Sequence, residues 1–203
     1  MSGFYRPDTG KIFFQSNEIT DLAPHKIYKL GIARTFQIPS LFWKLTVLEN
    51  LLVAEKGNPG ESFGKALFKK TWMQAEESSV SKATGILHLI GLSEQWDTTA
   101  LHLSGGQMKL LEMGRALMSG ASLLMLDEPV SGVNPTLAHE IFARIIKLRD
   151  TLGVTFLIVE HRLDIALGYV DHVNAMALGK LIASGDAQKV INDPKVIEAY
   201  LGK

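Results

Sequence analysis

The stretch that decides the fold runs from Leu103 to Pro129 and reads LSGGQMKLLEMGRALMSGASLLMLDEP. It opens with a serine and two glycines, continues with apolar residues three or four positions apart, and ends in four apolar residues and two carboxylates. This pattern predicts a helix followed by a buried strand. Open α/β sheets place their ligands at the carboxyl ends of their strands, so the carboxylates mark a candidate site.

The start of the predicted helix has the first candidate residues. Ser104 and Gln107 are three positions apart, which is the spacing of a capping box, so the helix begins here. Gly105 and Gly106 leave the backbone N–H groups of the first turn open to an approaching anion. The alternative is an ordinary capped helix with a glycine loop, because short motifs also occur by accident.

The two carboxylates have different expected roles. Asp127 ends the strand and suits a Mg²⁺ ligand, direct or through water, because hard cations take carboxylate oxygens. Glu128 is turned by half a pleat and suits polarising an attacking water. An acidic strand end in solvent is a reasonable alternative in isolation, but it fits poorly this close to the glycine helix.

Two further predicted strands also end in polar residues. Ile32–Phe36 precedes Gln37, whose amide could coordinate Mg²⁺ or a water, or simply cap a turn. The apolar run Val154–Val159 is typical of a parallel strand covered on both faces. It leads to His161, which could donate a hydrogen bond to a terminal phosphate oxygen, although a lone histidine is more often structural.

Outside these strands the pattern alternates between strand and helix, which predicts an α/β fold. The Gly57–Gly64 stretch is rich in Gly, Asn, Pro and Ser and is predicted to be the most flexible. The other predicted elements are a strand at Lys11–Phe14, a helix at Asp21–Gly31, a helix at Ala66–Ile90, and a helix that opens at Asn134-Pro135.

Composition excludes several classes of protein. At about 150 residues per domain, 203 residues make one domain or one domain with a lobe. Lysine plus arginine and aspartate plus glutamate both number 21, so a generally basic nucleic-acid binder is not expected. There is no cysteine, so the chain has no disulfide framework. No apolar run approaches the ~20 residues of a membrane span, so we expect no direct membrane insertion.

Together these motifs resemble the nucleotide-binding subunits of ABC transporters, in order and spacing, over essentially the whole chain. LSGGQ is similar to their signature motif, and LLMLDEP is similar to their Walker B strand. The segment SGVN, ending at Asn134, matches the D-loop, His161 the switch histidine, and Gln37 the Q-loop glutamine. The resemblance implies a P-loop NTPase-like parallel-sheet core with an inserted helical lobe, and ATP and Mg²⁺ as cofactors.

The resemblance also assigns roles. It implies that Glu128 and His161 are catalytic and that Asp127 and Gln37 contact magnesium. The residues it implies for nucleotide binding are Gln37, Ser104, Gly105, Gly106, Gln107 and Asn134. The segments GIARTFQ, LTVLENLLVA and VIEAYLG look like those of branched-chain amino acid importer ATPases. Arg162, which stands where an acidic residue usually follows the histidine, and the strand sequence NAMAL depart from that subfamily.

One departure from the family is larger. A phosphate-binding loop needs G-x-x-x-x-G-K-[ST], and no Gly-Lys pair in the chain is followed by Ser or Thr. We expect the first strand, an adenine-stacking aromatic and the Walker A loop to be missing from an N-terminally truncated chain. Alone, such a chain would hydrolyse ATP negligibly.

The family further implies partners and a place in the cell. Two ATPase subunits would form a head-to-tail dimer and bind transmembrane permease subunits, with the chain cytoplasmic and peripheral on the inner face of the plasma membrane. The core would comprise residues 1–42 and 120–203, and the helical signature lobe residues 43–119. The alternatives are a non-catalytic remnant, a half-site regulatory partner, an ATPase of a urea or amide importer, and a DNA-repair or chromosome ATPase.

Overall fold

The computed structural model describes residues 1–57 and 69–201. These residues form two units, Met1–Glu160 and His161–Lys203. Most of the stretch predicted to be flexible, and the first residues of the helix predicted from Ala66, lie outside the described residues. The predicted lobe boundaries near residues 42 and 119 stay a prediction.

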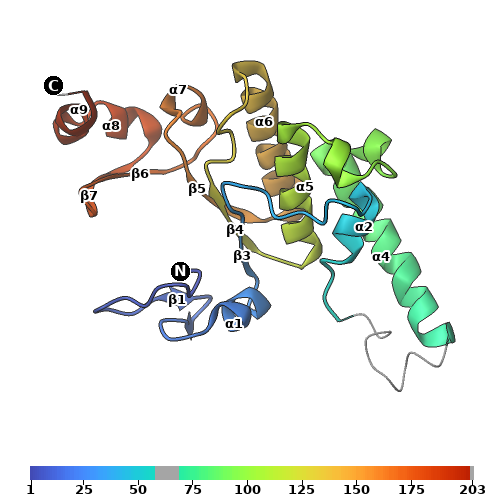
Figure 1. Cartoon of the computed structure of the whole chain (residues 1–203). Helices are drawn as coiled ribbons and strands as arrows, with labels where there is room; N and C mark the ends of the chain where they lie inside the picture. The colour runs from blue at the N-terminus through green and yellow to red at the C-terminus, as the bar shows by residue number, and fades with distance from the viewer. Residues whose placement is uncertain (58–68, 202–203) are drawn as a thin grey trace. The chain divides into compact units, whose positions relative to one another are not determined.

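The first unit contains a parallel sheet, as the α/β pattern predicts. Its strands β3 (Ile32–Arg34), β4 (Leu123–Asp127) and β5 (Thr155–Val159) lie in the order β3-β4-β5, as Figure 1 shows. Since all three run in the same direction, their carboxyl ends meet at one edge of the sheet. The predicted α/β fold class is confirmed.

One prediction about this sheet is wrong. The run Val154–Val159 was expected to be covered on both faces, but the exposed fraction is 40% for Leu157 and 61% for Val159. β5 is the outer strand in the order of the described strands, and α6 (Pro135–Leu152) contacts it. Because successive side chains of a strand point to opposite faces, alternate residues of β5 face away from this cover.

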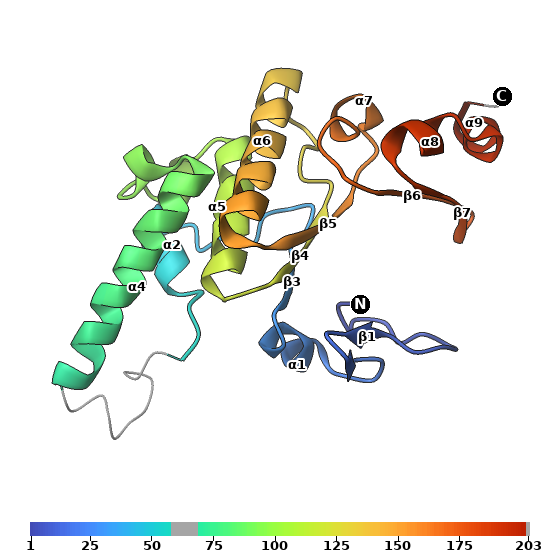
Figure 2. The ribbon, with the colours of Figure 1, turned by 180° about the vertical axis from the view of Figure 1, so that it is seen from behind.

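Helices α2 (Val47–Leu52), α4 (Lys69–Ile90) and α6 pack around α5 (Gly105–Met118). Figure 2 shows this group from behind. The predicted apolar stripe of α5 is buried, with Leu110, Met113 and Leu117 at most 6% exposed. At Gly114 a Cβ would lie 2.9 Å from Ile90 Cδ1, so this glycine lets α4 approach closely.

The N-terminal residues pack against the amino ends of β3 and β4. An antiparallel pair, β1 (Phe13–Phe14) and β2 (Asn17–Glu18), precedes α1 (Pro24–Lys29). The predicted helix at Asp21–Gly31 is therefore shorter than expected, because Pro24 is its first residue. A core cluster joins these elements to the sheet through Ile19, Ile27, Ile32 and Leu123.

Short 3₁₀ turns lie between α4 and α5, at Ser93–Gln95 and Ala100–His102.

The second unit consists of an antiparallel hairpin with three short helices. The hairpin pairs β6 (Val173–Ala177) with β7 (Lys180–Gly185), and Ala175 forms a small core with Val190 and Val196. Its turn places Leu178 and Gly179 at positive φ, as a tight hairpin requires. The helices are α7 (Leu163–Ala166), α8 (Ala187–Ile191) and α9 (Pro194–Leu201).

Within residues 1–57 and 69–201, no helix is both long enough and apolar enough to cross a bilayer.

Candidate functional site

The carboxyl ends of β3 and β4 bring two predicted site residues into contact. Gln37 lies three residues after β3, and its Nε2 donates a hydrogen bond of 3.0 Å to Oε2 of Glu128, the residue after β4. The two residues are 91 positions apart in the chain. The parallel pairing of β3 with β4 is what makes this contact possible, since it aligns the two strand ends.

Asp127, the last residue of β4, has a partner that sequence reasoning missed. Arg34 Nη2 lies 2.8 Å from Asp127 Oδ2, and each side chain is about a third exposed. The Arg34 guanidinium also lies 5.6 Å from the centre of the Phe36 ring. A lone arginine within a short apolar strand was the available signal, because such a charge needs a partner at the strand end.

The turn after β4 holds Glu128 in an uncommon backbone conformation. Its φ is 49°, in the left-handed region that non-glycine residues rarely adopt. The Glu128 N–H donates to Val159 O at 2.9 Å, and the Val130 N–H donates to Glu160 Oε1 at 3.0 Å. These bonds fix the turn to the end of β5, so the direction of the Glu128 side chain is set by its surroundings.

The predicted capping box at the start of α5 is present. The Ser104 N–H donates to Gln107 Oε1 at 2.8 Å, and the Gln107 N–H donates to Ser104 Oγ at 3.4 Å. The two glycines differ in their surroundings. Gly105 is exposed and has open space around it, whereas a Cβ on Gly106 would lie 2.5 Å from Leu137 Cδ2. Gly106 therefore serves the packing of α5 on α6, and the nucleotide role of both glycines stays a prediction.

The remaining two predicted site residues are Asn134 and His161. Asn134 caps α6, and its side chain accepts a hydrogen bond of 2.9 Å from the Leu137 N–H. His161 is the first residue of the second unit, next in sequence after Glu160. The nucleotide role of Asn134 and the catalytic role of His161 stay predictions.

Sequence reasoning also missed three charged residues in the middle of α5. Lys109 Nζ donates to the backbone carbonyls of Glu128 and Ser131, and Glu112 and Arg115 contact the loop after β3. Burial lowers the pKa of Lys109, although the nearby glutamates partly oppose this effect. Burial raises the pKa of Glu112 and lowers the pKa of Arg115. The signal was their spacing of three residues, which puts them on one side of the helix.

Magnesium is compatible with the donors at this sheet edge. Mg²⁺ is usually held by one or two carboxylates together with substrate phosphates and waters, so a closed protein cage is not required. The Asp127 carboxylate fits that pattern, as does the amide oxygen of Gln37, whose nitrogen is used by Glu128. In the described part of the chain, no group of three or more His, Asp or Glu residues forms a metal cage.

Family models match both ends of the chain. The model described as ABC transporter matches residues 1–131, which is more than half of the chain. A second model, described as branched-chain amino acid ATP-binding cassette transporter, matches residues 180–203.

Relatives match the chain along its whole length. A probable branched-chain amino acid transport ATP-binding protein LivG from Archaeoglobus fulgidus is 51% identical over 205 residues, covering 100% of this chain and 77% of the relative. The high-affinity branched-chain amino acid transport ATP-binding protein LivG of Escherichia coli is 33% identical, covering 100% of this chain and 80% of the relative.

Solved structures agree with these relatives. The crystal structure of a nucleotide-free ATP-binding cassette from an ABC transporter has a TM-score of 0.80 at 47% identity, covering 100% of this chain and 81% of its own. The ADP conformation of an ABC transporter cassette also has a TM-score of 0.80, at 45% identity, covering 100% of this chain and 80% of its own. The chain therefore belongs to the ATP-binding subunits of ABC transporters, a family of ATPases coupled to transport.

Proposed function

We propose that this chain binds ATP with Mg²⁺ as the subunit that energises an ABC importer. The observation that carries the proposal is the contact between Gln37 and Glu128 beside Asp127, at the carboxyl ends of two parallel strands. Asp127 and Gln37 would hold Mg²⁺, which neutralises phosphate charge when bound. Glu128 would accept a hydrogen bond from the attacking water, and Gln37 would orient the Glu128 carboxylate.

The signature end of α5 would serve a second ATPase subunit. Ser104 and Gly105 are exposed, and the N–H groups of the first turn of a helix favour negative charge. In a head-to-tail dimer these residues would contact the nucleotide that the partner subunit binds. His161 and Asn134 would complete the nucleotide contacts.

The 203 residues contain no G-x-x-x-x-G-K-[ST] sequence, so the chain alone is expected to hydrolyse ATP negligibly. The test is Mg²⁺-dependent ATP hydrolysis by the purified chain, compared with its Glu128→Gln variant. Equal, background-level rates are expected. Turnover that depends on both Mg²⁺ and Glu128 would contradict this expectation.

A complementation assay tests the signature residues directly. The chain is mixed with the Archaeoglobus fulgidus relative, and ATP hydrolysis by the mixture is measured. The rate should be higher with the wild-type chain than with its Ser104→Arg variant. Lack of any association between the two proteins would overturn the half-site role.

The transported solute is proposed from similarity. Branched-chain amino acids are favoured because the relatives with this specificity match the full length of the chain. A urea or amide importer is the second candidate. Uptake of labelled leucine and labelled urea by cells with and without this chain would separate them, and loss of leucine uptake alone is expected.

A permease contact is proposed at exposed apolar side chains after Gln37 and before Ser104. Ile38, next to Gln37 in the sequence, is 79% exposed. Leu101 is 64% exposed, and its N–H donates at 3.1 Å to the carbonyl of Trp43, which is 41% exposed. Exposed apolar side chains in contact with one another mark interaction surfaces. Binding there would hold the chain at the inner face of the plasma membrane. Leu101→Asp should reduce co-purification with the permease without changing the fold, as far-ultraviolet circular dichroism would show.

A further inference from the structure

Three charged side chains on α5 contact both loops that carry Gln37 and Glu128. Lys109, Glu112 and Arg115 follow one another at intervals of three residues, so they lie along one side of the helix. This charged stripe is defined by those three residues. Each is partly buried, which is uncommon for charged side chains without a specific partner.

Lys109 contacts the turn after β4. Its Nζ donates to Glu128 O at 3.2 Å and to Ser131 O at 2.6 Å, so one ammonium group binds both ends of the turn. The Ser131 N–H also donates to Glu128 O at 3.1 Å. Because Glu128 has a positive φ, this turn needs contacts from outside to keep its conformation.

Glu112 and Arg115 contact the loop after β3. Glu112 Oε1 accepts from the Ser40 N–H at 3.4 Å, and the backbone of Phe36 donates to the same carboxylate. Arg115 Nη1 donates to Ser40 O, and the Arg115 guanidinium lies 4.9 Å from the centre of the Phe42 ring. Gln37 therefore lies between Phe36 and Ser40, which both contact side chains of α5.

Stability alone does not explain the stripe. Burial shifts the pKa of all three groups against their charged forms, so each charge costs free energy in the folded state. Arg115 Nε is buried and has no hydrogen-bond partner among the described residues. The helix already packs through a separate apolar side that includes Leu111 and Met113. A purely structural helix could use apolar residues in place of the stripe.

We propose that the charged stripe positions the Gln37–Glu128 pair by attaching both of its loops to the signature helix. Lys109, Glu112 and Arg115 are positioning residues in this arrangement. The signature helix α5 would thereby connect two sites. Its first turn, at Ser104, would contact the nucleotide that the partner subunit binds, and its middle would position the Glu128 carboxylate of the chain's own site. The catalytic meaning of the pair rests on the proposed function, whereas the two attachments do not.

Hydrogen–deuterium exchange of the full chain tests the first attachment. In Lys109→Met, amides of residues 128–133 should exchange about tenfold faster, because the turn loses the two bonds that the Lys109 ammonium donates to it. Amides of residues 36–42 should change less than about twofold. Lys109→Arg keeps the donors and the charge and should restore most of the protection.

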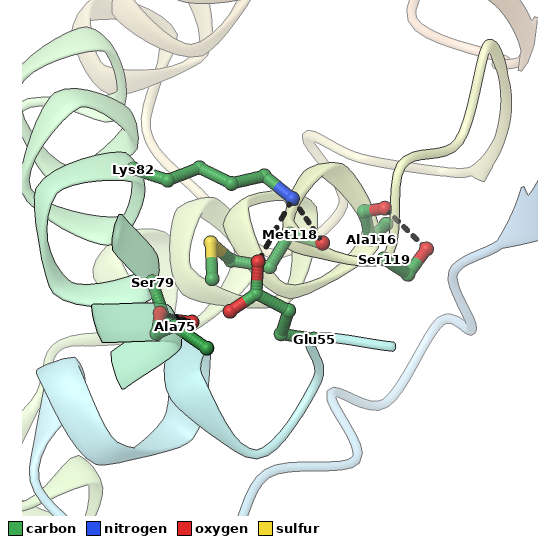
Figure 3. Close-up of polar contacts among 7 residues, drawn as sticks. All are labelled: Glu55, Ala75, Ser79, Lys82, Ala116, Met118 and Ser119. Carbon is green, nitrogen blue, oxygen red and sulfur yellow. Dashed lines mark hydrogen bonds and ion pairs between the residues drawn. The ribbon is translucent and has the colours of Figure 1, made fainter. Parts of the chain in front are cut away.

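Lys82→Met is the matched control. Lys82 Nζ also donates to a backbone carbonyl of α5, Met118 O at 2.8 Å, and pairs with Glu55 Oε1 at 3.4 Å. Figure 3 shows both contacts at the C-terminal end of α5. The same substitution removes a comparable bond from α5, so both loops should keep their wild-type exchange rates.

Arg115→Met tests the second attachment and should reverse the pattern, with faster exchange at residues 36–42 and little change at 128–133. Unchanged exchange in both variants would overturn the proposal. So would a uniform increase over the whole chain, since this would assign the stripe to global stability. If exchange follows the proposal but the complementation assay fails, the attachments stand and the proposed function falls.

Discussion

The neighbouring strands β4 and β5 have similar apolar sequences and different surroundings. In β4, LLMLD, the side chain of Leu124 is fully buried, whereas in β5, TFLIV, Leu157 and Val159 are exposed. β4 is paired with a strand on each side, and β5 is paired with β4 at one edge. Apolar composition therefore shows that a strand can be buried, but its neighbours decide which of its faces are.

The largest difference between the two strands is expected in the free energy of unfolding lost when a leucine in each is replaced by alanine. Leu124→Ala should lower the free energy of unfolding by about 3 kcal/mol, because it leaves a cavity among packed side chains. Leu157→Ala should cost less than about 1 kcal/mol, since much of this side chain is already in water. Urea denaturation of both variants measures the two values. Equal losses would mean that β5 is covered as fully as β4.

The next largest loss of stability is expected where the residue after β5 binds the turn after β4. Glu160, which follows β5, accepts the N–H of Val130 in the turn after β4. Glu160→Ala would leave this buried N–H unpaired and should cost about 1–2 kcal/mol. Glu160→Gln keeps an acceptor and should cost about half as much. Thermal unfolding of both variants provides the comparison, and a gentler effect for alanine would contradict the contact.

A smaller effect should come from the backbone of Glu128. Glycine adopts positive φ without strain, so Glu128→Gly should be more stable than Glu128→Ala by about 0.5–1 kcal/mol. Both variants lose the carboxylate and its bond to Gln37, so their difference isolates the backbone term. Denaturant midpoints of the pair measure it. An alanine variant of equal or higher stability would argue against a left-handed turn.

The smallest effect is expected from Glu112, whose pKa is raised by burial, although Arg115 and Lys109 oppose the rise. The folded chain then binds a proton before the unfolded chain as the pH falls. Stability should therefore rise as the pH falls from neutral through the folded pKa of Glu112. Relative to Glu112→Gln, the wild-type chain should gain stability over this window. A constant difference across the titration would show that folding does not raise the pKa of Glu112.

Local sequence signals predicted much of this molecule. The capping box at Ser104, the strand ending at Asp127 and the cap at Asn134 all depend on residues close together in the chain, so a single segment suffices to predict them. Their order and spacing also identified the family. Gln37 and Glu128 were each predicted as site residues at a strand end, but the hydrogen bond between them was not predicted.

Contacts that depend on packing were not predictable in the same way. The pairing of Arg34 with Asp127 requires knowing that β3 lies beside β4, which no local pattern states. The bonds of Lys109 depend on the angle between α5 and the turn after β4. The exposed face of β5 was mispredicted because hydrophobicity does not specify which neighbours are present.

The register of the sheet has a consequence for the order of folding. β4 pairs with β5 across about 30 residues of chain, and β3 pairs with β4 across about 90. Closing the longer loop costs about 0.9 kcal/mol more in chain entropy. We expect β3 to dock late, so that Ile32→Val changes the unfolding rate rather than the folding rate. Slower refolding in that variant would contradict this order. The pair of Gln37 and Glu128 would then form only as the chain completes its fold, and a partly folded molecule would lack it.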